Sequence, residues 1–254
     1  MNRFTSRRVV ATALHALCSL VVAAAAALVV FWLWYPPPFA SMAGGLSLFG
    51  LMMGVDVVLG PTLTAVIANP AKPLPAFRRD FIVIVLVQLC ALGYGLYTLA
   101  LARPVYVAFE VDRFRVVASA DVDADSLAEA PESLRALPWT GPVLIAAVKP
   151  TDPAEQLRAI ELGLAGFDLS MLPRYWRSYE SSRGEAWRVA RPVGQLVARY
   201  PQAAAKLAQI AVAAGQAPEA LRFLPLLSRQ ASWVTLLAGP DARVVGHLPL
   251  DGFF

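Results

Sequence analysis

The stretch Leu46–Ala68, LSLFGLMMGVDVVLGPTLTAVIA, contains a single charged residue, Asp56, near its middle. Its 23 residues, at about 1.5 Å each, make a helix of roughly 34 Å, which is enough to cross a bilayer core about 30 Å thick. A carboxylate halfway along such a helix costs about 2.5–3.5 kcal/mol. We therefore expect a membrane-spanning helix whose acid faces a polar partner or a protein-lined environment.

The distribution of charge predicts how many segments span the membrane and in which direction. Two further runs, Val9–Tyr35 and Phe81–Ala102, contain no Asp, Glu, Lys or Arg. The connection between the first two runs is uncharged, whereas basic residues lie before the first run and between the second and third: Arg3, Arg7, Arg8, Lys72, Arg78 and Arg79. The positive-inside rule therefore predicts three spans, at about 9–35, 46–68 and 81–102, with a cytoplasmic N-terminus.

A cleaved signal peptide is the alternative interpretation of the first run, because a basic start and an alanine-rich tract are typical of one. The apolar run is too long for the core of a signal peptide, and it ends in aromatic residues suited to a membrane interface. These residues are Phe31, Trp32, Trp34 and Tyr35. We therefore expect an uncleaved first helix.

Residues 103–254 are long enough for one globular domain with its own core, outside the cytoplasm. Asp152, Pro153 and Glu155 have the pattern of a helix start, and Gly239-Pro240-Asp241 indicates a hairpin turn. The other patterns predict strands at Tyr106–Ala118, Pro142–Val148, Ser232–Leu237 and Arg243–Leu248, and an acidic loop or short helix at 121–132. Tyr175–Ala214 is expected to be mostly helical, with interruptions near Gly184, Pro192 and Pro201. The fold class is thus a membrane protein with three transmembrane α-helices (1–102) followed by a mixed α/β extracytoplasmic domain (103–254), whose strand order does not follow from the sequence.

Depth along the three spans suggests which polar side chains meet. Asp56 lies about 18 Å from the cytoplasmic end of its helix, close to Tyr94 at about 20 Å and Ser19 at about 15 Å. His15 and Gln88 share a second layer at about 9–10 Å. We expect Asp56 to bond Tyr94 or Ser19, and His15 to bond Gln88. These contacts would either hold the bundle together or provide a polar handle for the transmembrane segment of a partner.

Small residues in the second span indicate close helix packing, within this chain or with a partner. Gly50 and Gly54 form a GxxxG pair, which allows two helix backbones to approach each other. Gly60-Pro61 is expected to kink or loosen the inner half of the helix, with Thr62 or Thr64 satisfying the freed carbonyls.

Catalysis has little support in the sequence. Residues 103–254 contain one histidine, His247, and no cysteine, so a Cys/His pair or a cysteine-rich metal site cannot be built there. A Ser–His–acid triad using His247 stays open, but no GxSxG-type elbow accompanies it, and phosphate-binding loops are absent. The arginines of the stretch 174–199 are expected to form a solvated helix face. We expect no catalytic, metal or cofactor site.

Nucleic-acid binding gains no support from the basic isoelectric point of about 9.3. Residues 103–254 carry 16 basic and 16 acidic side chains, so the net charge of +4 belongs to residues 1–102. The charge therefore reports membrane topology.

Several motifs between about 34 and 114 together resemble the type IV pilin accessory proteins, often called the TfpX/TfpZ group. They are Trp34-Tyr35-Pro36, Gly44-Gly45, Val55–Pro61 (VDVVLGP), Arg79-Asp80, Gln88-Leu89, Ala91-Leu92, Tyr94-Gly95, Arg103-Pro104-Val105 and Phe109–Phe114 (FEVDRF). Beyond Ala118 the chain is similar to the family in length and pattern.

The resemblance implies a non-catalytic, chaperone-like protein of the bacterial inner membrane, with residues 103–254 in the periplasm. It would bind a type IV pilin subunit before or during assembly, with other pilus assembly proteins and the lipid bilayer as further partners. The alternatives are a membrane-anchored periplasmic enzyme or pilin-modifying factor, and a transporter subunit with Asp56 as its proton site. The residues expected to bind the partner, through a polar layer and helix packing, are Asp56, Gly50, Gly54, Gly60, Pro61, Gln88 and Tyr94.

Overall fold

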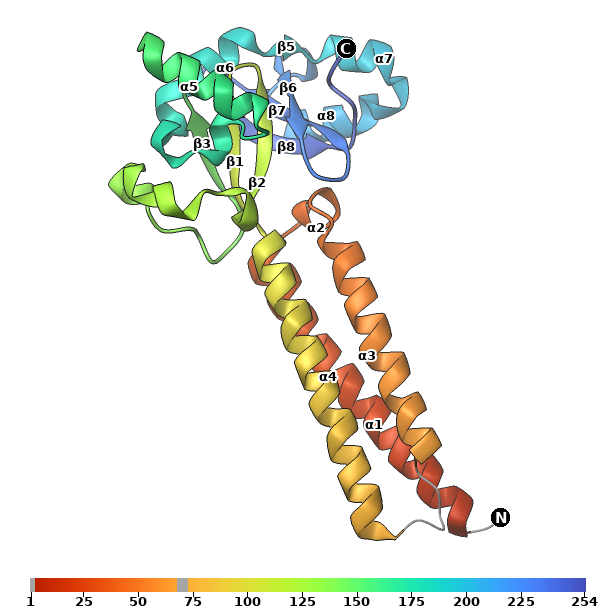
Figure 1. The fold of residues 1–254 in the computed structure, drawn as a ribbon. Coiled ribbons are helices and arrows are strands. Elements are labelled where there is room, and N and C mark those ends of the chain that lie inside the picture. Colours follow the sequence, from red (N-terminus) through yellow and green to blue (C-terminus); the bar gives the residue numbers. More distant parts are fainter. Residues whose placement is uncertain (1–2, 68–72) are drawn as a thin grey trace. The chain divides into compact units, whose positions relative to one another are not determined.

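The computed structural model describes residues 3–67 and 73–254 (Figure 1). The chain divides into two compact units, Met1–Ala102, which we call the membrane unit, and Arg103–Phe254, which we call the sheet domain.

Within the described residues, three helical segments of the first unit are long and apolar enough to cross a membrane: Val9–Trp34, Gly45–Ile67 and Leu74–Ala102. The first comprises most of α1 (Arg3–Leu28) and a π-helical end, η1 (Val29–Trp34). The second is α3 (Gly45–Ile67), preceded by the short α2 (Phe39–Met42), and the third is α4 (Leu74–Ala102). The predicted fold class of three apolar helices followed by a mixed α/β domain is confirmed.

The start of α4 differs from the predicted start at Phe81. The helix already includes Arg78, Arg79 and Asp80, which the sequence placed in a loop. Pro75, in its first turn, removes only an N–H that has no partner within the helix, so proline is compatible with a helix start there. Charged side chains at the end of a span do not terminate its helix.

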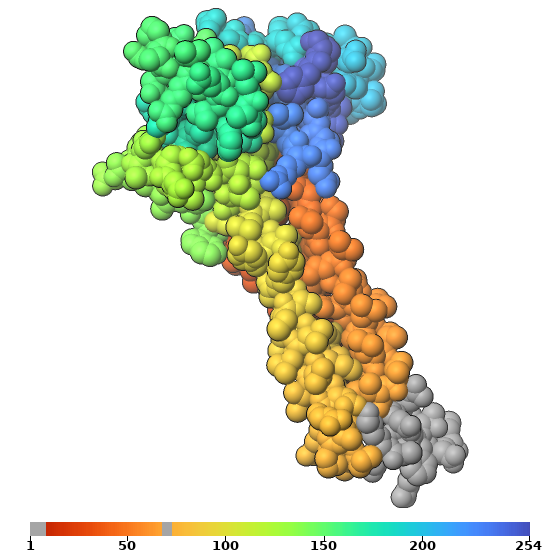
Figure 2. All heavy atoms as spheres, in the orientation of Figure 1, coloured from red at the N-terminus to blue at the C-terminus, as the bar shows by residue number. Residues whose placement is uncertain are grey.

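The helix α3 is the centre of the bundle, because it packs along both α1 and α4. Its side chains meet those of α4 in the space-filling view (Figure 2). The helix α3 continues without a break through the buried Pro61 to Ile67, and the kink or loosening that we expect at Gly60-Pro61 stays a prediction. Thr62 donates a hydrogen bond to the carbonyl of Val58 at 2.6 Å.

The π-helical end of the first span leads into a small core built around Tyr35. This side chain is fully buried, and its hydroxyl donates to the carbonyl of Leu99 at 2.9 Å. A Cβ on Gly45 would lie 2.6 Å from the Tyr35 ring, so the start of α3 approaches as closely as only glycine allows. The Tyr-Pro and Gly-Gly motifs of the sequence thus fix the turn between the first two spans.

Residues 103–254, all of which are described, form one eight-stranded mixed sheet with the order β4-β3-β1-β2-β6-β7-β8, and β5 pairs with β6. The β1–β3 and β2–β6 pairs are parallel, and the remaining pairs are antiparallel. The strands are β1 (Pro104–Glu110), β2 (Arg113–Ala118), β3 (Val143–Ala147), β4 (Trp176–Ser178), β5 (Arg191–Pro192), β6 (Arg222–Leu227), β7 (Ser232–Ala238) and β8 (Arg243–Leu248).

Helices pack on this sheet to form two apolar cores. One core surrounds β1 and β3 and contains the fully buried Trp176. The other lies where two helices meet β6, β7 and β8, and includes Leu196, Leu207 and Phe223. The helices of the domain are α5 (Pro153–Leu164), α6 (Arg183–Val189), α7 (Gly194–Arg199) and α8 (Ala204–Ala213).

Several predictions for this domain are confirmed, and three need correction. The β3 strand, the capped start of α5 and the β7–β8 hairpin occur as expected. Tyr106–Ala118 is a hairpin instead of one strand, because Val111 adopts a positive φ of 56° and turns the chain. The region Tyr175–Ala214 is less helical than predicted at its start, where Trp176–Ser178 form β4, whereas the predicted interruption near Pro192 is confirmed as β5. The sequence pattern did not predict β6, which contains Pro225 and lacks alternation because its middle is buried on both faces.

His247 on β8 makes the stability of this domain dependent on pH. Its Nδ1 lies 3.1 Å from the Thr235 hydroxyl, and burial lowers its pKa to about 4. The unfolded chain takes up this proton below about pH 6.5, whereas the folded domain does so only near pH 4. We predict that the free energy of unfolding is level above pH 6.5 and falls by up to about 3 kcal/mol towards pH 4 from this group.

Thermal unfolding of the full-length chain in detergent, followed by circular dichroism between pH 4 and 7.5, measures this effect. The His247→Gln variant, which stays neutral, should lack the part of the decrease due to His247. Parallel pH profiles for the wild type and the variant would contradict the prediction.

Candidate functional site

A polar layer centred on His15 joins α1, α3 and α4. His15 is 7% exposed; its Nδ1 lies 2.5 Å from the Thr64 hydroxyl and its Nε2 lies 2.8 Å from Oε1 of Gln88. Gln88 then donates from Nε2 to the backbone carbonyl of Asp56 at 3.0 Å. The predicted contact between His15 and Gln88 is confirmed. Thr64 was not predicted as the second partner of His15. It lies about 6 Å from the end of its own span, so its depth differs from that of His15 by less than one helical turn.

Two glycines allow the helices to pack closely: Gly60 at the polar layer and Gly95 outside it. A Cβ on Gly60 would overlap the side-chain amide of Gln88, and a Cβ on Gly95 would overlap the side chain of Met52. In contrast, a Cβ on Gly50 or Gly54 would meet no atom within 4 Å. The GxxxG pair therefore does not pack against α1 or α4, and the close contacts are made at Gly60 and Gly95.

A groove of about 560 Å³ lies beside the polar layer, with walls from α1 and α4. Two residues of α3, Met53 and Asp56, line it as well. Most of the lining is apolar, and the walls include Leu14, Cys18, Val22, Phe81, Leu89 and Leu92. A concave apolar surface with a few polar groups is the usual form of a binding site.

The residues that the sequence nominated for partner binding divide into three sets. Asp56 and Gln88 line the groove, whereas Gly60 and Pro61 are buried inside the bundle. The third set, Gly50, Gly54 and Tyr94, lies on exposed helix faces and contributes nothing to the groove.

The predicted hydrogen bond from Asp56 to Tyr94 or Ser19 is wrong. The Tyr94 side chain is 73% exposed, and Ser19 lines the same groove as Asp56 without bonding to it. Among the described residues, the Asp56 carboxylate has no hydrogen-bond or ion-pair partner. Equal depth in the membrane does not determine toward which neighbour a side chain points. That direction depends on the rotation of each helix about its axis, which depth along the sequence does not give.

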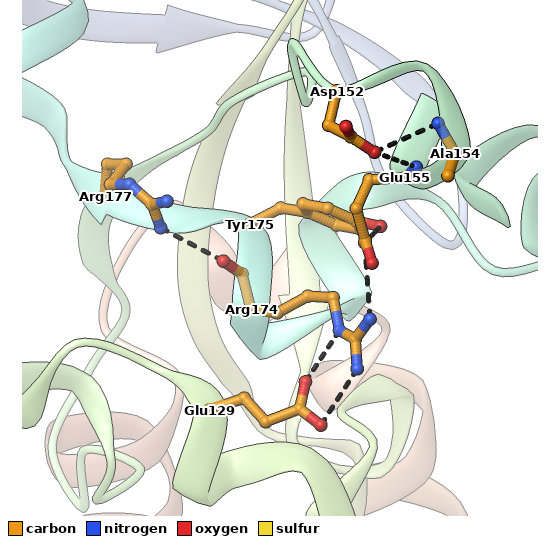
Figure 3. Close-up of polar contacts among 7 residues, drawn as sticks. All are labelled: Glu129, Asp152, Ala154, Glu155, Arg174, Tyr175 and Arg177. Atoms are coloured by element: carbon orange, nitrogen blue, oxygen red, sulfur yellow. Dashed lines mark hydrogen bonds and ion pairs between the residues drawn. The ribbon is translucent and has the colours of Figure 1, made fainter. Parts of the chain in front are cut away.

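In the sheet domain, a cluster of charged side chains surrounds Arg174 (Figure 3). Its guanidinium binds Glu129 through two hydrogen bonds, of 2.6 and 2.9 Å, and binds Glu155 at 3.3 Å. Tyr175 donates to the same Glu155 carboxylate at 2.9 Å. Arg174 holds the pKa of Glu129 below its usual value, while burial and Glu155 raise the pKa of Tyr175.

This cluster lines a recess of about 460 Å³, but its charges satisfy one another. It joins three segments that are distant in the sequence: the turn at Glu129, the start of α5 and the segment before β4. Among the described residues, no group of three or more His, Cys, Asp or Glu side chains could hold a metal ion. The cluster is therefore best explained as a structural clamp.

The solvated helix face that we predicted for the arginines of the stretch 174–199 is confirmed only in part: Arg188 of α6 lies exposed, whereas other arginines make contacts within the domain. Arg174 takes part in the clamp, and Arg191 donates to the backbone carbonyls of Gly252 and Phe254. Arg199 lies 4.9 Å from the centre of the Phe254 ring. These side chains hold parts of the domain together.

The fold and site define a class of protein with three helices able to span a membrane, an open groove between two of them and a mixed α/β domain. A family model described as "Fimbrial assembly protein FimB" matches residues 3–44. The chain is 36% identical to the fimbrial assembly protein, serogroup I, of Dichelobacter nodosus and 34% identical to that of serogroup E1, each over 94% of both chains.

The chain therefore belongs to the family of fimbrial assembly proteins, which confirms the resemblance to a pilus accessory family. No solved structure matches it.

We predict that Gly60→Ala disrupts the polar layer, because the new Cβ displaces the Gln88 amide from His15 and from the Asp56 carbonyl. The free energy of unfolding should fall by about 1–2 kcal/mol, the range measured for hydrogen bonds between membrane helices. Gly54→Ala is the matched control on the same helix and should cause no loss, since its Cβ meets nothing. Unfolding of the purified chain in mixed micelles with increasing SDS measures both variants. An equal effect of the two substitutions would show that Gly60 has no special role.

Proposed function

We propose that this protein is an inner-membrane accessory factor that assists type IV pilus biogenesis by binding a pilin subunit before or during assembly. In this proposal it is chaperone-like and non-catalytic, and the apolar helix of the pilin lies in the groove between α1 and α4. The observation that carries the proposal is this groove, in a chain whose relatives are named fimbrial assembly proteins.

The groove suits a helix because its two walls are themselves helices that present apolar side chains. Leu14 and Leu89, on opposite walls, are 59% and 56% exposed, so these surfaces are uncovered in the chain alone. Van der Waals packing contributes to the association of helices in a bilayer, and a groove between two apolar walls offers an incoming helix contact on both sides. A third helix laid between the walls would cover both leucines.

The proposed orientation rests on the basic residues before the first span and between the second and third. By the positive-inside rule these ends lie in the cytoplasm, and the sheet domain lies in the periplasm. The sheet domain would then be on the side of the membrane where the globular head of a pilin is expected. Both contacts must be released at assembly, so we expect interfaces of moderate size.

Photocrosslinking in intact membranes tests the proposal. A photoreactive residue is placed singly at Leu14, Leu89 or Tyr94 of the full-length protein, in cells that produce pili. We expect pilin adducts from Leu14 and Leu89, and few from Tyr94, which does not line the groove. Adducts from Tyr94 alone would place the pilin on another face, and the absence of pilin adducts from all three sites would reject a pilin partner.

A further inference from the structure

We propose that Asp56 recognises the helix that occupies the groove, through a hydrogen-bond donor that this helix carries within the membrane. The inference rests on the proposed function and adds the chemistry of the partner: an apolar helix with one hydroxyl, amide or ammonium group at the level of Asp56. The groove would then select its partner by the position of this donor.

The first observation is that, among residues 3–67 and 73–254, the Asp56 carboxylate has no hydrogen-bond or ion-pair partner. Both ring nitrogens of His15 are engaged, one with Thr64 and one with Gln88. Both ends of the Gln88 amide are also engaged, because its oxygen meets His15 and its nitrogen donates to the backbone carbonyl of Asp56. Neither side chain can turn to the carboxylate without breaking a contact between helices.

The second observation is that Asp56 faces the groove, although α3 also has an exposed face without a groove. Asp56 lines the cavity together with three other polar side chains, Ser19, His15 and Gln88, while the rest of the lining is apolar. A carboxylate in such a place is costly in the free protein, and a donor from an incoming helix offsets that cost only in the complex. The contribution of Asp56 to the binding free energy therefore depends on whether the partner helix carries a donor at this level.

Charge complementarity also distinguishes the possible occupants. The acyl chain of a lipid fills an apolar groove but offers no donor to a carboxylate. A helix with a single polar side chain satisfies both the apolar walls and Asp56. The groove extends from Ala11 to Ala23 along α1, about 18 Å at 1.5 Å per residue, so the donor must lie within roughly three helical turns.

The test combines crosslinking with substitutions at Asp56 in the full-length protein, using the major pilin of the same cells and the photoreactive residue at Leu89. Asp56→Leu, which removes the acceptor, should reduce capture of the pilin by about 5- to 30-fold. Asp56→Glu should retain most of it. Thr62→Val is the matched control, since Thr62 is an exposed polar residue of α3 whose hydroxyl bonds within its own helix.

A measurement on the free protein separates recognition from folding. Asp56→Leu should keep or raise the unfolding temperature in detergent, because the carboxylate makes no bond to any of the described residues. A lower unfolding temperature would show that Asp56 supports the bundle itself and would overturn the inference. Unchanged capture by Asp56→Leu would also overturn it while leaving the proposed function intact, whereas capture of lipid alone by the wild type would reject both.

The reciprocal experiment identifies the donor. Polar residues in the apolar helix of the pilin are replaced one at a time by Leu. One replacement should reproduce the loss seen with Asp56→Leu and add little when the two are combined, as expected for two groups that interact. Independent, additive losses for every pair would contradict a direct contact.

Discussion

The structure of the membrane unit depends on one histidine ring that bonds to two other helices at once. His15 of α1 meets Thr64 of α3 and Gln88 of α4, and Gln88 continues to the backbone of Asp56. Such bonds have no competition from water inside a bilayer, and Gly60 provides the space in which the Gln88 amide lies. The polar layer joins the three helices, and the groove between α1 and α4 stays open beside it.

The two units use their charged side chains in different ways. In the sheet domain, Arg174 is paired with Glu129 and Glu155, so its guanidinium finds carboxylate partners within the chain. In the membrane unit, the single carboxylate of α3 faces a largely apolar groove and has no partner in the part of the chain that the structure describes. A stable fold can tolerate such a group when binding satisfies it, and this contrast is why we assign recognition to the membrane unit.

Sequence patterns predicted the spans, the fold class, the family and the contact between His15 and Gln88. These depend on length, charge and depth, which can be counted along the chain. The partner of Asp56 could not be predicted because rotation about the helix axis depends on packing at Gly60 and Gly95. In the sheet domain, β6 was missed because a strand buried on both faces has no alternation, and its parallel pairing with β2 joins residues more than 100 positions apart. The groove could not be predicted, because it is formed by side chains of three helices whose packing does not follow from the sequence pattern.

The central claim is that the groove holds the pilin helix, and the two native cysteines of the chain allow a direct test. Both are exposed, but Cys18 lines the groove and Cys90 does not. Cysteines placed singly along the apolar helix of the pilin are oxidised in native membranes together with variants that retain either Cys18 or Cys90. We predict disulfides with Cys18 that recur every three to four residues along the pilin helix, and none with Cys90. Disulfides through Cys90 alone, or none with either cysteine, would contradict the account.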